Sequence, residues 1–125
     1  MLDHVSIGVA DQSRSKTFYD AVLAPLGYSC LSEFPGSLGY GRDGVSLWIL
    51  QTDRPVPADM ASGLHFCFAA PNRNSVRAFH AAALAHGGDD NGEAGLRADY
   101  GDGYFAAFAI DPDGYRIEAY CSSDD

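Results

Sequence analysis

The chain has 125 residues, and 46% of them are hydrophobic, which suits one globular domain with its own core and excludes a disordered chain. Its 8 basic and 17 acidic residues give a formal net charge of −9. This charge disfavours nucleic acids and anionic membranes as partners, because both are bound through clustered Lys and Arg. No segment approaches the ~20 apolar residues of a membrane span, and the N-terminus lacks the basic region of a signal peptide.

The three cysteines are odd in number, far apart in the sequence, and form no Cys-x-x-Cys pair; they are Cys30, Cys67 and Cys121. This usage is typical of a reduced, cytoplasmic protein with free thiols. We expect each of them to be a small buried residue rather than a reactive thiol.

The first half of the chain predicts a strand, a helix and three further strands. Residues 1–9 alternate in strand fashion, and Asp11 can cap a helix that continues to about residue 24 and is ended by Pro25 and Gly27. Three further strands are separated by glycine turns, at residues 28–34, 38–41 and 45–51.

Residues 53–62 contain two prolines and show no periodicity, so they are predicted to be a linker. The pattern then starts over with a strand at 64–70. A helix follows, capped by Asn72 or Asn74 and ended by two glycines. Residues 89–103 are polar and rich in glycine, which predicts a long loop with one short strand at most.

The chain closes with a hairpin. Its turn, 111–114, has the sequence Asp-Pro-Asp-Gly, in which Pro presets φ and Gly takes the position of positive φ. On the outgoing strand, 115–121, a period of two places Arg116, Glu118 and Tyr120 on one face. Glu is depleted in strands, so either this face is wet or the carboxylate binds something.

A four-residue hairpin loop would pair Ile110 with Tyr115, and therefore Ala107 with Glu118. On this register Phe105 lies on the same face as Glu118. Arg97 and Arg116 could bind a substrate carboxylate or pair with a surface acid, and we favour the surface pair for Arg97.

The two halves are a repeat. A shift of 61 residues (65 − 4) superposes His4 on His65, and a shift of 70 residues (118 − 48) superposes Trp48 on Glu118. The chain is thus predicted to be a single α+β domain over 1–125, built from modules 1–52 and 63–121 around the linker. In each module the amphipathic helix covers one face of a small sheet and leaves the opposite, concave face open.

His4 and His65 occupy the same place on the same strand of the two modules, and Glu118 faces the open side of the second. Two imidazoles and a carboxylate can hold Fe, Mn, Ni, Co or Zn as divalent ions and leave positions open for substrate. A strand His is more often a structural residue and a strand Glu is usually solvated, but the repeat places both histidines in one geometric position.

Four segments together resemble the vicinal oxygen chelate superfamily, which includes glyoxalase I, bleomycin resistance proteins and extradiol dioxygenases. They span nearly the whole chain, at residues 3–9, 18–27, 63–66 and 111–118. The resemblance implies two tandem βαβββ modules that form an open, cup-shaped mixed sheet, usually in a homodimer. It also implies a divalent metal ion in the cup, held by His4, His65 and Glu118.

One position departs from the glyoxalase I pattern, which has a second Glu in the strand that closes the first module. Trp48 stands there, and its indole N–H can only donate, so it either stacks on a substrate or fills the core. Without the second carboxylate to move the substrate proton, glyoxalase I activity is doubtful. The remaining 2-His-1-carboxylate set is typical of non-haem iron oxygenases.

The sequence therefore predicts a metal-dependent lyase or dioxygenase that chelates a small organic substrate through vicinal oxygens, with Glu118 as the catalytic carboxylate. The alternative is a metal-free protein that binds a planar drug-like molecule. In both hypotheses the ligand is expected to contact a set of aromatic side chains, namely Trp48, Tyr104, Phe105 and Tyr120.

Overall fold

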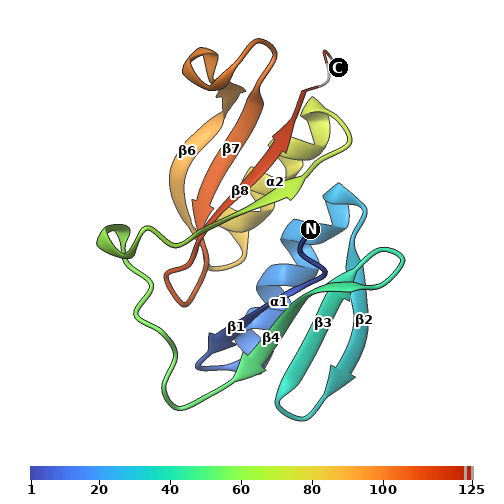
Figure 1. Cartoon of the computed structure of the whole chain (residues 1–125), viewed down its shortest axis with the longest axis vertical. Helices are drawn as coiled ribbons and strands as arrows, with labels where there is room; N and C mark the ends of the chain where they lie inside the picture. The colour runs from blue at the N-terminus through green and yellow to red at the C-terminus, as the bar shows by residue number, and fades with distance from the viewer. Residues whose placement is uncertain (123, 125) are drawn as a thin grey trace.

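The computed structural model describes residues 1–122 and 124, which form two four-stranded sheets, each with one helix behind it (Figure 1). The first module contains β1 (Val5–Val9), α1 (Gln12–Leu23), β2 (Ser29–Phe34), β3 (Ser37–Gly41) and β4 (Val45–Gln51). The second contains β5 (His65–Ala69), α2 (Arg73–Ala85), β6 (Asp89–Leu96), β7 (Phe105–Ile110) and β8 (Arg116–Cys121). Short 3₁₀ helices lie at Ala24–Leu26, Met60–Ser62 and Ala98–Tyr100.

Both sheets have the same topology. Their strand orders are β1-β4-β3-β2 and β5-β8-β7-β6, with the first pair parallel and the other pairs antiparallel. The predicted α+β fold of two βαβββ modules is therefore confirmed.

Side-chain caps begin both helices as the sequence predicts. The Asp11 side chain accepts a hydrogen bond from the Arg14 amide, and the Asn72 side chain accepts one from the Ser75 amide. The first helix ends at Leu23, and the chain then makes a 3₁₀ turn that Gly27 closes at φ 90°.

The core lies between the sheets and the two helices, which pack against each other behind the sheets (Figure 1). Its largest fully buried side chains include Phe18, Tyr19, Tyr40, Phe79 and Tyr115. The opposite faces of both sheets are turned the same way and are left uncovered by helices (Figure 1). Neither helix in the described part of the chain is long and apolar enough to cross a membrane.

Two strands differ from the sequence prediction. The first strand begins at Val5 rather than at residue 1. Residues 89–96, expected to be mostly loop, form the eight-residue edge strand β6. Pairing with β7 overrides the weak strand propensity of this polar segment, and two shifts of register around Gly92 accommodate its glycines.

The expected register of the closing hairpin is wrong by one residue. Ile110 pairs with Arg116, and Phe108, not Ala107, lies opposite Glu118. Asp111 and Tyr115 continue this register by one pair: the Asp111 amide donates to the Tyr115 carbonyl, and the Tyr115 amide donates to Asp111 Oδ1. These bonds hold Tyr115 beside the turn. Three residues, 112–114, then form the loop in place of the expected four.

The same turn fastens the second module to the first. Tyr19 in α1 donates its hydroxyl to Asp111 Oδ2 at 2.5 Å, and Tyr115 donates its hydroxyl to the Gly8 carbonyl at 2.6 Å. Asp113 accepts from the Ala10 amide at 2.9 Å and from Arg14 at 3.0 Å. The sequence motif that closes the chain thus joins the two modules.

Burial raises the pKa of the Asp111 carboxyl above its ordinary value, in spite of the hydrogen bonds that lower it. The folded chain then holds this proton more tightly than the unfolded chain does. The contribution of Asp111 to the free energy of unfolding should therefore fall as the pH rises from about 3.9, the ordinary pKa of an Asp carboxyl, through its raised pKa in the folded chain.

We expect the stability advantage of the wild type over Asp111→Asn, which does not titrate, to be larger at pH 4 than at pH 7. Urea unfolding of both proteins at the two pH values measures it. An advantage that grows toward pH 7 would show that the hydrogen bonds outweigh burial.

Candidate metal and ligand site

The open face of the second sheet gathers most of the residues on which the sequence prediction depends. In the parallel pair of β5 and β8, Cys67 lies opposite Glu118 and His65 lies opposite Arg116. Phe108 of β7 lies opposite Glu118 on the other side. The predicted period of two on β8 therefore places Glu118 at the centre of this face.

Glu118 is only 3% exposed, and both of its carboxylate oxygens have partners. His65 Nε2 lies 2.9 Å from Oε1, and the Tyr104 hydroxyl donates to Oε2 at 2.6 Å. His65 itself is 41% exposed, so the pair opens to solvent on the imidazole side. The carboxylate is thus held in one orientation from two sides.

The neighbours of Glu118 are kept protonated. Partial desolvation of the thiol, followed by the charge of Glu118, raises the pKa of Cys67 to about 12, although the residue as a whole is exposed. Burial, followed by its hydrogen bond to Glu118, raises the pKa of the Tyr104 hydroxyl. Both groups therefore remain hydrogen-bond donors toward the carboxylate at neutral pH.

The spacing of the His65 and Glu118 atoms fits two ligands of one metal ion. Adjacent ligands of an octahedral ion, each bonded at about 2.1 Å, lie about 3.0 Å apart. The measured Nε2–Oε1 distance is 2.9 Å. The pair can therefore hold two neighbouring positions of a divalent ion with only a small shift.

His4 does not join this pair within one chain. It precedes β1, is exposed, and its Nδ1 lies 2.8 Å from Asp3. The strands β1 and β5 run in opposite directions where the two sheets meet, so their starting ends lie apart (Figure 1). Among the described residues, no group of three His, Cys, Asp or Glu side chains is close enough to hold a metal ion.

The predicted aromatic contacts divide into three cases. Tyr104 and Tyr120 pack against each other beside Glu118, with ring centroids 4.1 Å apart and ring planes 31° apart. Trp48 lies opposite Ser6 and Gly39, on the open face of the first sheet. A Cβ at Gly39 would approach its ring to 2.8 Å, so the glycine makes room for the indole.

The expectation that Phe105 contacts a ligand beside Glu118 is wrong. The register shift in the hairpin turns its side chain to the opposite face, where it is 5% exposed in the core. There its ring lies under the guanidinium groups of Arg73 and Arg77, at 4.9 Å and 5.0 Å. Burial of the Phe105 ring against α2 accounts for the position of this side chain.

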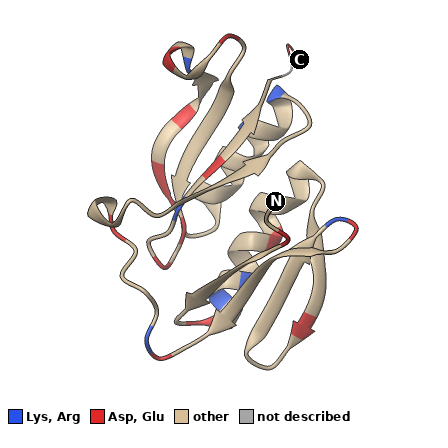
Figure 2. Ribbon diagram, in the orientation of Figure 1, with Lys and Arg blue, Asp and Glu red and all other residues tan. Residues whose placement is uncertain are grey.

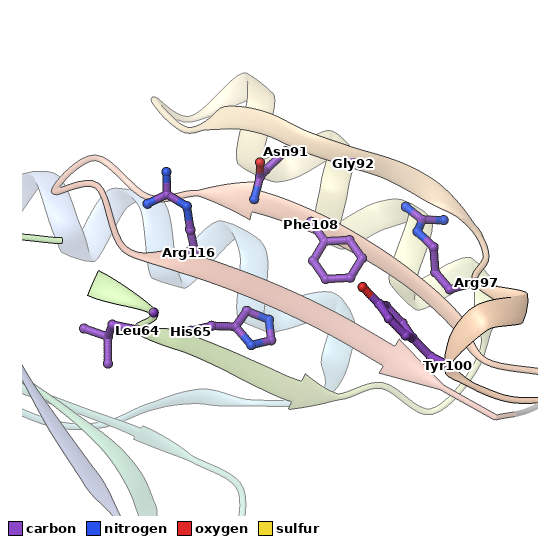
Figure 3. A pocket seen from close by; sticks show the side chains of 9 residues that line it. Leu64, His65, Asn91, Gly92, Arg97, Tyr100, Phe108 and Arg116 are labelled. Atoms are coloured by element: carbon purple, nitrogen blue, oxygen red, sulfur yellow. The ribbon is translucent and has the colours of Figure 1, made fainter. Parts of the chain in front are cut away.

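A pocket of about 500 Å³ opens on the face beside His65 (Figure 3). The Phe108 ring stacks on the His65 imidazole with centroids 6.1 Å apart, and Arg97 lies over the same ring at 5.3 Å. Tyr100 lines the pocket on the side of Arg97, and Arg116 lines it on the other side (Figure 3). This volume suits a small organic molecule.

Two residues of this face were not singled out from the sequence. Cys67 is exposed beside Glu118 rather than buried, although its shared parity with His65 could have indicated this. Phe108 was missed because its face depends on the hairpin register. The surface ion pair expected for Arg97 is absent among the described residues, and its guanidinium donates to the Glu93 carbonyl at 2.6 Å.

The family model of the Glyoxalase/Bleomycin resistance protein/Dioxygenase superfamily matches residues 1–119. The chain belongs to this superfamily. The resemblance inferred from the sequence is thereby confirmed, and the two modules described above are those of the glyoxalase fold.

Solved structures agree with this assignment over nearly the whole chain. A glyoxalase/bleomycin resistance protein from Albidiferax ferrireducens T118 is 34% identical, with a TM-score of 0.82 over 96% of this chain and 97% of that one. A putative glyoxalase from Bacillus halodurans is 26% identical, with a TM-score of 0.73 over 96% and 94%.

A glyoxalase-related enzyme from Fulvimarina pelagi, 18% identical with a TM-score of 0.74 over 96% and 86%, shares the fold. No curated protein matches the sequence.

Proposed function

We propose that this glyoxalase-family protein is a divalent-metal enzyme that binds a small organic substrate through vicinal oxygens. The observation that carries the proposal is the position of the His65–Glu118 pair, which lies on the open face of the second sheet with its two atoms 2.9 Å apart and the imidazole 41% exposed. A metal ion bound there would act as a Lewis acid on a developing oxyanion. Fe, Mn, Ni, Co and Zn all suit an imidazole and carboxylate set.

The residues around the pair have distinct parts in this proposal. Tyr104 holds one carboxylate oxygen of Glu118 and leaves the other directed at His65. Orientation by such a neighbour is typical of metal ligands. Trp48 occupies the repeat position of Glu118 and supplies no carboxylate, so we do not propose glyoxalase I activity.

We further propose that His4 completes the site from a second copy of the chain in a homodimer. Within one chain His4 is exposed and lies apart from the pair, at the start of the opposed strand β1. A two-fold dimer would set the first module of one protomer against the second module of its partner. Each dimer would then contain two equivalent sites.

Metal uptake tests the proposal. Purified protein is incubated separately with Fe, Mn, Ni, Co and Zn salts, desalted, and its metal content measured by elemental analysis. About one ion per chain is expected for the wild type, and at least about 100-fold weaker binding for Glu118→Ala and His65→Ala.

His80→Ala is the matched control, because His80 also pairs with a carboxylate, Asp90, at 2.8 Å but lies on α2. It should take up metal like the wild type. A wild type that takes up no metal, or a Glu118→Ala protein that retains it, would contradict the proposal.

A group of packed tyrosines favours a second candidate function, a metal-free protein that binds a planar ligand. Tyr100, Tyr104 and Tyr120 form a continuous aromatic group, with centroids 5.3 Å and 4.1 Å apart. Planar ligands stack well on such surfaces. This candidate is supported if the wild type takes up no metal while a planar aromatic ligand still changes Trp48 fluorescence.

A further inference from the structure

The Arg116 side chain has a hydrogen-bond donor that the folded chain leaves unsatisfied. Its Nε is the one buried side-chain nitrogen or oxygen in the described part of the chain that has no hydrogen-bond partner. Buried polar groups in native proteins nearly always have partners, and an exception calls for an explanation. A buried charged donor without one costs stability.

The side chains that line the pocket offer Arg116 no ion-pair partner. No acidic side chain lines the pocket that it shares with Arg97, His65 and Asn91. Neither arginine forms an ion pair with a described residue, whereas Arg14 is paired with Asp113 at 3.0 Å. Figure 2 shows acidic positions spread over both modules, so a pocket lined only by basic and neutral side chains stands apart.

We infer that this pocket binds a small organic acid, with the carboxylate of the ligand on the guanidinium of Arg116. A guanidinium presents parallel N–H donors that match a carboxylate, and these bonds would satisfy the buried Nε. The Phe108 ring forms the wall beside Arg97, which suits a flat, apolar body of the ligand (Figure 3).

The inference adds a substrate class to the proposed function. That the acid is a substrate, and not only a ligand, rests on that proposed function. Arg116 lies directly opposite His65 across the strand pair and two residues before Glu118, about 7 Å along the strand. One small acid can therefore contact Arg116 and still place further oxygen atoms near the His65–Glu118 pair. Binding of the carboxylate itself requires no metal.

The test uses benzoate as a flat carboxylate and benzamide as its neutral counterpart, titrated calorimetrically into wild-type protein treated with a chelator. Benzoate is expected to bind the wild type, and to bind Arg116→Gln at least about tenfold more weakly, because a hydrogen bond to a charged group is lost. Arg116→Lys, a point charge without the planar fork, should fall in between. Benzamide should bind both proteins weakly and equally.

Arg54→Gln is the control, since Arg54 is an exposed residue of the linker, and it should bind benzoate like the wild type. Thermal unfolding checks the fold: Arg116→Gln should be about as stable as the wild type, because it replaces a charged group that has a buried, unpartnered donor by a neutral amide. If Arg116→Gln does not fold, the benzoate affinity of Arg116→Lys tests the inference in its place.

Equal benzoate affinity in the wild type and in the folded Arg116 variant would overturn the inference, as would a wild type that binds benzoate no better than benzamide. Because these titrations contain no metal, a failed metal uptake would remove the proposed enzyme and leave the acid site intact. Intact metal uptake without benzoate binding would remove the acid site and leave the proposed metal enzyme standing.

Discussion

Replacement of Asp111 by alanine should destabilise the protein by about 3–5 kcal/mol, because it removes the acceptor of several buried donors at once. Asp111 is 3% exposed and accepts from the Tyr19 hydroxyl and from the amides of Asp113 and Tyr115. These bonds close the last hairpin and join it to α1. Urea unfolding at pH 7 measures the change in the free energy of unfolding.

The corresponding turn of the first module supplies a control in Asp43, which lies at the repeat position of Asp113, precedes Gly44 and is exposed. Asp43→Ala should stay within about 0.5 kcal/mol of the wild type. Tyr19→Phe should fall between the two, since it removes one hydrogen bond and leaves the turn closed. Equal unfolding midpoints for Asp111→Ala and Asp43→Ala would refute a joining role for this turn.

Mixed dimers should recover metal binding that each variant alone has lost, if His4 acts across the subunit interface. When His4→Ala and Glu118→Ala chains are refolded together, a mixed dimer has one site with both defects and one intact site. Random pairing makes half of the dimers mixed, so about a quarter of all sites should bind metal. Elemental analysis after desalting measures this fraction, with each variant refolded alone as the baseline.

The control mixture combines His65→Ala with Glu118→Ala. Both residues lie in the second module, so every site of a mixed dimer lacks one of them and no recovery is expected. Metal content in the His4→Ala and Glu118→Ala mixture no higher than in this control would mean that sites are not shared between chains. Size-exclusion chromatography with light scattering establishes the dimer independently.

Local sequence patterns predict much of the fold. The caps Asp11 and Asn72 begin the helices as expected, because a capping side chain acts on amides two or three residues away. The face of Glu118 also followed from the sequence, since a strand alternates with a period of two whatever it packs against. The repeat then identified the equivalence of Trp48 and Glu118, which the register of both sheets bears out.

The errors arose where long-range contacts decide the outcome. The sequence predicts the wrong face for Phe105, because the hairpin register depends on how Asp111 and Tyr115 bond across the turn. The sequence does not predict the full strand β6, because this polar, glycine-rich segment is extended only by pairing with β7. Neither contact has a local signal in the sequence.

The sequence by itself determined the two modules, the helix ends and the placement of His65 and Glu118 on an open face, because these depend on short-range periodicity and capping. Only the tertiary structure decided which of these residues meet. Packing of α1 against α2 sets the modules side by side and leaves His4 apart from the pair. The tertiary structure also decides that the Nε of Arg116 is buried without a partner, because the burial of an atom depends on every chain segment around it.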